Sequence, residues 1–247
     1  MEMLNFIFDA VKSVAPGDFT GFTFFIGSVS MLAATVWFLM QHGQVDKKFK
    51  DSMLVAALIT GIAAVHYFYM REQWVATGES PTELRYIDWI LTVPLMVVEF
   101  ALLTGVGMRK LFWASVVMLV TGYFGESGVA GGNAFIWGTV SAAAYFFMAY
   151  EVGCLTIFGG PSGAVGNALN SGSGKIPSAG RMLQWFVLVG WAIYPIGYLA
   201  GTAADDPNLW YAGMSALNDS LNMNIIYNVG DAINKIGFGM AVWSAAR

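Results

Sequence analysis

The stretch LNMNIIYNVGDAINKIGFGMAVWS, residues 221–244, decides how this chain is organised. It is long enough to cross a bilayer as a helix, yet near its middle it carries Asp231 and, one helical turn later, Lys235. A lysine inside a membrane costs about 2.5–3.5 kcal/mol on insertion scales, so it usually marks a functional site. A desolvated lysine amine can form a Schiff base with a carbonyl compound. The alternatives are a structural ion pair or a lysine that reaches back to the membrane surface, which the apolar run at 237–244 disfavours.

The composition is that of an integral membrane protein. Of 247 residues, 57% are hydrophobic and 11% are charged, whereas soluble domains have about 25% charged residues. The net charge is −4 and no basic tract is present, so the sequence does not indicate nucleic-acid binding. A single cysteine, Cys154, excludes a disulfide framework and a C-x-x-C metal site, and we interpret it as a packing residue. We predict no metal site.

Apolar runs of about twenty residues each predict seven membrane helices. The predicted helices cover residues 20–41, 52–70, 84–104, 111–124, 134–158, 182–202 and 221–244. Glycine, proline and asparagine clusters predict the connections, and the longest of these is a Gly/Ser tract at 159–180. We therefore expect an all-α membrane protein with one domain over 1–247, folded as a seven-transmembrane-helix bundle. Residues 1–18 lack the basic start of a signal peptide and are expected to form a short extracellular N-terminal segment.

Basic residues in the connections predict the orientation. If seven helices alternate in direction, one side receives Lys47, Lys48, Lys50, Arg109, Lys110, Lys175, Arg181 and Arg247. The other side receives Lys12 and Arg71, together with the acidic Asp205, Asp206 and Asp219. Cytoplasmic connections carry the excess of lysine and arginine. We therefore expect a cytoplasmic C-terminus and an extracellular N-terminus.

Two more acids fall inside the third predicted helix. Asp88, Thr92 and Glu99 are separated by four and seven residues, so they share one helical face. At 1.5 Å per residue, Asp88 and Glu99 lie about 16 Å apart along the axis. A line of carboxylate, hydroxyl and carboxylate on an inward face is typical of a proton path. The alternative is that these groups only link helices by hydrogen bonds.

A histidine and several aromatic residues complete the candidate site. His66 is expected at the depth of Asp88, where a tuned His–Asp pair and an ordinary structural histidine are both open. Aromatic side chains could line a long apolar slot that ends at Lys235, although many tryptophans in membrane proteins are interfacial. The slot residues are Tyr67, Trp89, Trp191 and Tyr194, with Pro195 beside them. Pro94 and Pro195 lie inside helices and are expected to kink them.

Four segments carry a resemblance to a known family. They are AVHYFYMR at 64–71, RYIDWILTVPLMVVEF at 85–100, GWAIYPIGY at 190–198 and IYNVGDAINKIGFG at 226–239. In this order and spacing they resemble the microbial rhodopsins, most closely the proteorhodopsins, over nearly the whole chain. The resemblance implies a light-driven outward proton pump, a transporter rather than an enzyme. It also implies all-trans-retinal bound to Lys235 as a protonated Schiff base.

The resemblance implies a role for each polar residue in the centre. Asp88 would be the main counterion and the proton acceptor, and Asp231 would be the second counterion. Arg85 would lie on the extracellular side of them. His66 would hydrogen-bond to Asp88. Glu99 matches the cytoplasmic proton donor, so that Asp88, Thr92 and Glu99 form the acid–threonine–acid triplet of outward proton pumps.

The resemblance also implies a chromophore pocket. Its residues would be Tyr67, Trp89, Met96, Met118, Gly122, Tyr145, Trp191, Tyr194 and Pro195, with apolar Met96 at the position that goes with green absorption. In relatives with a carotenoid antenna, a glycine near Gly138 opens a gap beside the retinal ring, so a carotenoid near Gly138 is a further expectation. The paired glutamates of proton release in archaeal pumps have no clear match, since Glu126 alone is acidic in that connection.

Other readings of the same residues remain open. One is a photosensory rhodopsin that signals to a transducer, and the acid at Glu99 argues against it. Another is a retinal-free transporter or receptor with a buried ion pair, and light-gated cation conduction is a minor third. For the pump, the expected partners are protons, the lipid bilayer and further copies of the chain in a pentamer or hexamer. The expected location is the bacterial inner membrane.

Overall fold

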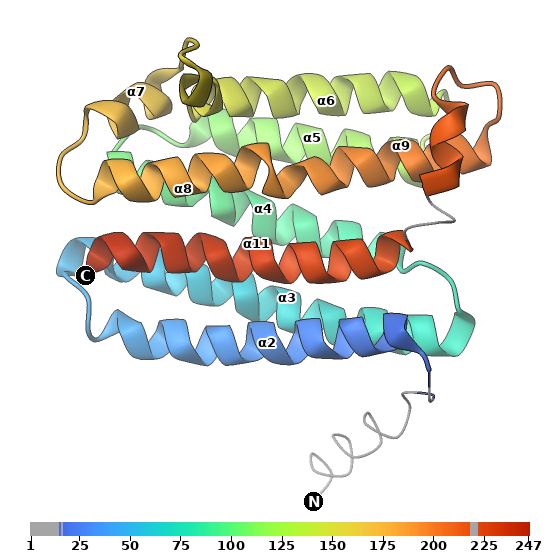
Figure 1. Ribbon diagram of the computed structural model, residues 1–247, viewed down its shortest axis with the longest axis horizontal. Helices are drawn as coiled ribbons and strands as arrows, with labels where there is room; N and C mark the ends of the chain where they lie inside the picture. The colour runs from blue at the N-terminus through green and yellow to red at the C-terminus, as the bar shows by residue number, and fades with distance from the viewer. Residues whose placement is uncertain (1–14, 16, 218–221) are drawn as a thin grey trace, which may run out of the picture.

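Long helices run side by side along one common direction in the computed structural model, which describes residues 15, 17–217 and 222–247 (Figure 1). They are α2 (Phe19–His42), α3 (Lys50–Thr77), α4 (Thr82–Thr104), α5 (Arg109–Ser127), α6 (Ala134–Glu151), α8 (Ile176–Leu188), α9 (Ile193–Asp205) and α11 (Met223–Ala246). Because α8 and α9 follow one another along one axis, they form a single span. Among the described residues the chain thus folds as an all-helical bundle of seven spans with no strand, as predicted.

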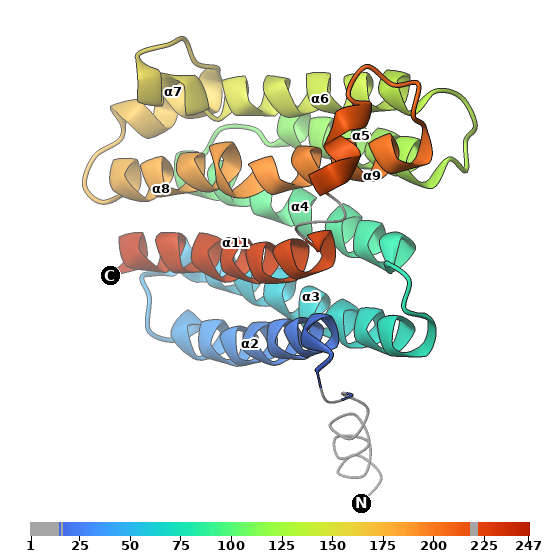
Figure 2. The ribbon, with the colours of Figure 1, turned by 45° about the vertical axis from the view of Figure 1, so that its right-hand side comes forward.

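Helix α11 occupies the middle of the bundle. In both ribbon views it lies between the pair α2–α3 and the pair α8–α9, and α4 passes behind it (Figures 1 and 2). It contacts α2, α3 and α8. Its charged residues therefore face other helices and not lipid: Asp231 and Lys235 are each 1% exposed.

The outer faces of the bundle are apolar. Four described segments are long and apolar enough to cross a membrane by length and composition: Phe19–His42, Lys47–Thr77, Thr82–Thr104 and Ile176–Asp205. Large hydrophobic side chains point outward from several helices, including Leu32, Val65, Trp113, Phe146 and Ile233. A soluble surface rarely carries so much contiguous apolar area, whereas a lipid-facing surface requires it.

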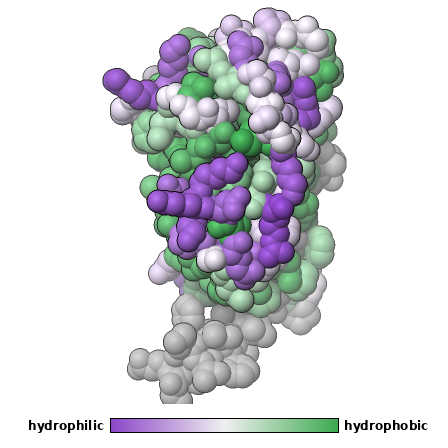
Figure 3. All heavy atoms as spheres, turned by 90° about the vertical axis from the view of Figure 1, so that its left-hand side faces the viewer, coloured by the Kyte–Doolittle hydropathy of each residue, from purple (hydrophilic) through white to green (hydrophobic). Residues whose placement is uncertain are grey.

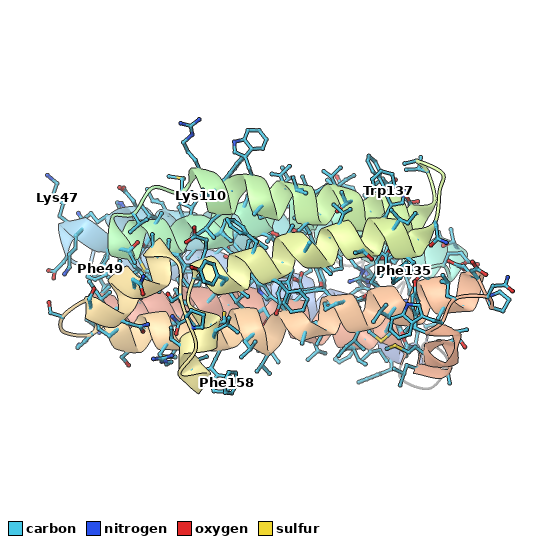
Figure 4. The ribbon with its side chains drawn as sticks, turned by 90° about the horizontal axis from the view of Figure 1, so that it is seen from above. Lys47, Phe49, Lys110, Phe135, Trp137 and Phe158 are labelled. Atoms are coloured by element: carbon cyan, nitrogen blue, oxygen red, sulfur yellow. The ribbon has the colours of Figure 1, made fainter. Side chains whose placement is uncertain are left out.

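The basic residues of the connections gather at one end of the bundle. Lys47, Lys48, Arg109, Lys110, Lys175 and Arg247 are all exposed, and Figure 3 shows hydrophilic side chains grouped on this end, which also holds the C-terminus. Figure 4 places Lys47 and Lys110 toward this end and Phe135 and Trp137 toward the other. We call it the basic end. Lys12, Asp219 and Leu221, which the predictions also used, lie outside the described residues, as does most of 1–18.

The fifth helix is shorter than predicted, and the tract after it is not a plain loop. Helix α6 ends at Glu151, because Gly153 takes a left-handed conformation (φ +84°) that turns the chain into a 3-10 helix, η2 (Cys154–Phe158). Within the Gly/Ser tract a short helix, α7 (Ala164–Ser171), forms. The Glu151 carboxylate accepts a hydrogen bond from Ala164 N at 2.9 Å. It caps the start of α7, where a negative charge is favourable.

The sixth span starts earlier than predicted and is broken. Helix α8 begins at Ile176, inside the expected loop, and ends at Leu188; the 3-10 helix η3 (Gly190–Ala192) separates it from α9. Pro195 explains the break, because it has no N–H for the carbonyl four residues earlier and its ring crowds that carbonyl. The kink expected from Pro195 is therefore present, and it takes the form of a change in helix type just before the proline.

Candidate functional site

A buried ion triad lies at the centre of the bundle. Lys235 Nζ is 2.5 Å from Asp88 Oδ2 and 2.6 Å from Asp231 Oδ2. None of the three side chains is more than 2% exposed. Helix α11 supplies Lys235 and Asp231 from successive turns, and α4 supplies Asp88. The predicted neighbours of Lys235 are thus in contact with it, and its charge is neutralised inside the protein.

The two carboxylates have different surroundings. Both oxygens of Asp231 accept hydrogen bonds, Oδ2 from Lys235 and Oδ1 from the hydroxyl of Tyr194 at 2.7 Å. Asp88 Oδ1 is buried and has no hydrogen-bond partner. Hydrogen bonds to a carboxylate stabilise its charged form. Of the two acids, Asp88 is therefore the one with an oxygen free to take a proton.

The inner face of α4 continues from Asp88 toward the basic end through Thr92 to Glu99. All three lie on the continuous helix α4, whose period puts them on one face as predicted, and all three side chains are fully buried. The Thr92 hydroxyl donates to the backbone carbonyl of Asp88 at 2.8 Å. Both carboxyl oxygens of Glu99 lack a hydrogen-bond partner. Ser52 of α3 faces Glu99, although the two do not make a hydrogen bond of good geometry.

Arg85 lies one turn before Asp88 on α4 and is 2% exposed. Its guanidinium donates to the side-chain oxygens of Asn224 at 2.9 Å and Asn228 at 3.3 Å. The guanidinium carbon is 4.9 Å from the ring centre of Tyr227. Among the described residues Arg85 makes no ion pair, so its charge is held by neutral amides and an aromatic face.

The expected hydrogen bond between His66 and Asp88 is not formed in this structure. His66 is half-buried, and its Nδ1–H donates to the carbonyl of Ile62, one turn earlier on the same helix, at 2.9 Å. A histidine in a helix has this carbonyl within reach, so the local bond competes with a bond to another helix. His66 is nevertheless close enough to Asp88 for their charges to interact.

An apolar cavity of about 260 Å³ lies next to the triad. Tyr194 connects the two, because it lines the cavity and also bonds to Asp231. Seven predicted pocket residues line the cavity: Trp89, Met118, Gly122, Tyr145, Trp191, Tyr194 and Pro195. The prediction also named Tyr67 and Met96, which are buried but are not among the lining residues. Tyr67 packs instead between α2 and α11, where its hydroxyl donates to the carbonyl of Tyr227.

The break in the sixth span closes one side of this cavity and is fixed by neighbouring side chains. Asn234 Nδ2 donates to the carbonyl of Gly190 at 2.9 Å. The Tyr145 hydroxyl donates to the carbonyl of Val187, also at 2.9 Å. Helices α11 and α6 thereby satisfy carbonyls of the broken helix, which are costly to bury without a partner.

Gly138 on α6 also lines the cavity, and the space toward which a side chain there would point is filled. A side-chain carbon added at Gly138 would meet the ring of Tyr198 at 2.7 Å. The Tyr198 hydroxyl donates to the carbonyl of Ala134, one turn earlier on α6, at 2.5 Å. Glycine at this position therefore allows the close approach of a tyrosine from α9.

Three polar residues of the site, Asn224, Asn228 and Asn234, were not predicted. The spacing of the first two in the sequence would have identified them. Asn224, Asn228, Asp231 and Lys235 are spaced by four, three and four residues, so they form one polar stripe along α11. That stripe predicts the contacts of Arg85 with Asn224 and Asn228. Asn234 falls outside the stripe, and nothing in the sequence marks its bond to Gly190.

Comparisons with known proteins agree with this geometry. A sequence model of the family described as "Bacteriorhodopsin-like protein" matches residues 18–247. The chain is 41% identical over 237 residues to a green-light absorbing proteorhodopsin of Gamma-proteobacterium EBAC31A08, covering 93% of this chain and 87% of that protein.

Solved structures agree as well. The crystal structure of a blue light-absorbing proteorhodopsin from Med12 superimposes with a TM-score of 0.72 and 38% identity, covering 93% of this chain and 98% of that one. Xanthorhodopsin, a light-driven ion pump with dual chromophore, superimposes with a TM-score of 0.71 and 26% identity, covering 92% and 91% of the two chains. With its apolar helices and buried triad, this chain is an integral membrane protein that belongs to the bacteriorhodopsin-like family of microbial rhodopsins.

Proposed function

We propose that the protein is a light-driven outward proton pump that carries all-trans-retinal on Lys235. The observation that carries the proposal is the buried triad, in which one amine lies between two carboxylates next to an apolar, aromatic cavity. Retinal attached there as a protonated Schiff base would supply light absorption and a light-triggered change in proton affinity. The residues fit this group, because a primary amine condenses with an aldehyde and aromatic and methionine side chains suit a polyene.

Asp88 and Asp231 take different parts in this proposal. Asp88 is the acceptor of the outgoing proton, since it is within hydrogen-bond distance of Lys235 Nζ and has one oxygen without a partner. Asp231 stays a carboxylate, because Tyr194 and Lys235 donate to its two oxygens. It therefore keeps a negative charge in the centre after Asp88 has been neutralised.

Glu99 is the proposed donor that returns a proton to the centre. It is a buried carboxyl about 16 Å further along α4, on the side of Asp88 that faces the basic end. Direct proton transfer requires heavy atoms about 2.6–3.2 Å apart. Transfer from Glu99 therefore needs bridging water molecules on the inner face of α4 between Glu99 and the triad.

The direction of transport follows from the charge distribution. The basic end carries the exposed lysines and arginines of the connections, and such residues favour the cytoplasmic side. Glu99 then faces the cytoplasm and Arg85 the outside, with Asp88 between them. We place the protein in a bacterial inner membrane and expect an oligomer of five or six copies.

The proposal includes retinal alone and no antenna carotenoid. A gap beside Gly138 was the reason to expect a carotenoid, and the Tyr198 ring fills the space toward which a side chain at position 138 would point. A carotenoid ring would have to displace Tyr198 and break its bond to Ala134. We therefore leave an antenna carotenoid out of the proposal.

The visible spectrum tests the site directly. The purified chain should develop a visible absorption band when all-trans-retinal is added. In Asp88→Asn the band should shift to longer wavelength, because a negative charge beside the Lys235 nitrogen is lost, and light should no longer move protons. The conservative amide keeps the size of the side chain. An Asp88→Asn variant that still pumps would remove Asp88 from the acceptor role.

The rival readings give different outcomes in the same preparation. A photosensory protein would form the pigment but would not pump, and it would copurify with a helical partner. A retinal-free transporter or receptor would give no visible band. Passive light-gated current in a voltage-clamped membrane would indicate a cation channel.

A further inference from the structure

We propose that the retinal of this protein is loaded from the lipid bilayer, through an opening in the cavity wall between α6 and α9. This inference rests on the proposed function and names the route by which the aldehyde reaches Lys235. A route is needed because Lys235 is 1% exposed and its neighbours Asp88 and Asp231 are buried as well. While the bundle keeps this packing, a molecule reaches the amine through a cavity that is next to the triad and open to the outside.

The cavity beside the triad reaches the outer surface of the bundle along α6. Phe135, Thr139, Ala142 and Phe146 all line it, and their spacing of four, three and four residues puts them on one stripe of the helix. Phe135 is 43% exposed and Phe146 is 68% exposed, while Thr139 is exposed and Ala142 half-buried. Because these residues line the cavity and also face outward, the stripe is one edge of an opening. We call it the α6 edge.

Helix α9 and the turn after it form the opposite edge. Pro195 and Leu199 on α9 line the cavity, and so does Trp210, which is 78% exposed. The Trp210 ring makes an edge contact with the ring of Phe135, at 6.3 Å between centroids, and Figure 4 places Phe135 at the end opposite the basic end. This aromatic pair closes the outer end of the opening. Helix α6 packs extensively against α5 but only sparingly against α9.

The middle of the α6 edge has the smallest side chains. Thr139 and Ala142 lie there, between two phenylalanines. The part beside Gly138 is closed, because the Tyr198 ring fills the space there and is held by its hydrogen bond to α6. Phe146 borders the edge on the other side, about 12 Å from Gly138 along the helix. We therefore place the entrance at Ala142, between Tyr198 and Phe146.

The opening faces lipid. The exposed side chains that surround it on α6 are apolar, and they include Ile136 at 61%, Val140 at 41% and Phe147 at 41% exposure. Retinal is a polyene with a single polar group, and each buried CH₂ group favours an apolar environment by about 0.8 kcal/mol. Retinal is therefore dissolved in the same hydrocarbon layer that the opening faces, which is why we choose it as the occupant.

The layout of the cavity sets the order of entry. Tyr194 marks the triad end, because it lines the cavity and bonds to Asp231, whereas α6 lies on the side away from α11 (Figures 1 and 2). Retinal therefore enters with its aldehyde first and its ring last. At Lys235 the aldehyde carbon bonds to Nζ, and the aldehyde oxygen leaves as water with two hydrogens of the ammonium group. The nitrogen keeps its third hydrogen and its positive charge.

The rate at which the visible band appears tests this route. The retinal-free chain is reconstituted into phosphatidylcholine vesicles, and all-trans-retinal is added to the same membranes. In Ala142→Phe the band should appear about tenfold more slowly or slower still, because the retinal has to pass a side chain that fills the entrance. Ala143→Phe is the matched control, since Ala143 is the next residue of α6, is exposed and is not among the lining residues. It should load at the wild-type rate.

A second pair of variants widens the opening. Phe146→Ala should load several-fold faster than wild type, because it removes the ring at one side of the entrance. Phe147→Ala is its control, since Phe147 is exposed on the same helix and is not among the lining residues. The final absorbance and wavelength of each variant are compared with those of wild type, because an unchanged band shows that the loaded site is intact.

The outcomes separate the route from the pigment itself. An Ala142→Phe variant that reaches a full, unshifted band as fast as Ala143→Phe would overturn the lateral route and leave the pump proposal intact. Equal rates are also expected if a lipid chain or a carotenoid permanently fills the opening, or if retinal enters from water at the outer end. If Ala142→Phe gives no band or a shifted one, the Phe146 pair decides, and equal rates there overturn the route. A wild-type chain that forms no band rejects retinal binding altogether.

Discussion

Lys235 is tolerated in the bundle because Asp88 and Asp231 neutralise it. Both carboxylates lie within 2.6 Å of its nitrogen, and all three groups are buried. Removing one member of a buried ion pair typically costs about 3–5 kcal/mol, because the partner charge is left uncompensated. A site with two acids and one base also leaves one negative charge in place when a proton moves from the base to one of the acids.

Lys235→Ala is expected to abolish the visible band completely, because no other described side chain offers an amine beside the cavity. The measurement is the absorption spectrum after retinal is added to the purified variant. Lys110→Ala is the matched control, since its side chain is 76% exposed at the basic end, and it should form the pigment normally. Circular dichroism separates loss of the amine from loss of the fold. A visible band in helical Lys235→Ala would contradict the assignment.

Glu99→Gln should slow the return of a proton to the centre by roughly 10²-fold or more, the usual contribution of a positioned acid. The colour should change little, since Glu99 lies about 16 Å from Asp88 along the helix. Flash photolysis measures the recovery rate. Azide or another small weak acid in the medium should restore fast recovery by carrying protons to the centre. Recovery in Glu99→Gln as fast as in wild type would show that Glu99 is not the donor.

At this scale the charges of the site were predictable and their neutral partners mostly were not. A lysine and two acids inside membrane helices stand out because each is costly there, and the helical period brought Asp231 to Lys235. Whether His66 bonds to the Ile62 carbonyl or to Asp88 depends on side-chain geometry, which the spacing of residues in the sequence does not determine. Asn234 was missed for the same reason, since its partner is a carbonyl exposed only by the helix break.

In the sixth span, individual residues of the sequence can be matched to the packing around the helix break. Its two halves, α8 and α9, are joined by η3, and the carbonyls near the break are bonded by Tyr145 and Asn234. The absence of a side chain at Gly190 allows Asn234 to approach and form its bond, because a side-chain carbon there would overlap Asn234 Oδ1. The break is thus a fixed feature of the cavity wall, beside Trp191 and Tyr194.

Gly190→Ala should destabilise the pigment by about 1–3 kcal/mol, the usual cost of forcing an extra methyl group into a packed site. Gly201→Ala is the control on the same span, since nothing lies within 4 Å of the added carbon, and alanine there should be neutral or slightly stabilising. The measurement is the temperature at which the visible band is lost. Equal loss temperatures for the two variants would contradict the close contact between Gly190 and Asn234.

Seven apolar runs were enough to predict seven spans, because the length of a membrane helix is set by the bilayer. Their ends were less predictable. The left-handed turn at Gly153 and the cap of α7 by Glu151 depend on contacts between segments thirteen residues or more apart. The start of α8 at Ile176 falls in a tract whose glycines and serines favour a loop.

On the scale of the whole molecule, the charges that the proposed pump uses lie at four levels along the bundle. Exposed lysines and arginines occupy the basic end, the triad occupies the centre, and Arg85 lies toward the opposite end. Glu99 is buried between the basic end and the triad. In the proposed pump, this asymmetry along the membrane normal gives the light-driven proton movement its direction.

The pH change of the medium under illumination measures the direction of proton transport most directly. Cells that express the chain in their inner membrane and receive all-trans-retinal are illuminated in unbuffered medium. The medium should acidify in the light and recover in the dark, a protonophore should abolish the signal, and Asp88→Asn cells with the same amount of pigment should give none. Pigmented wild-type cells that leave the medium unchanged, or make it alkaline, would contradict an outward proton pump built around Lys235.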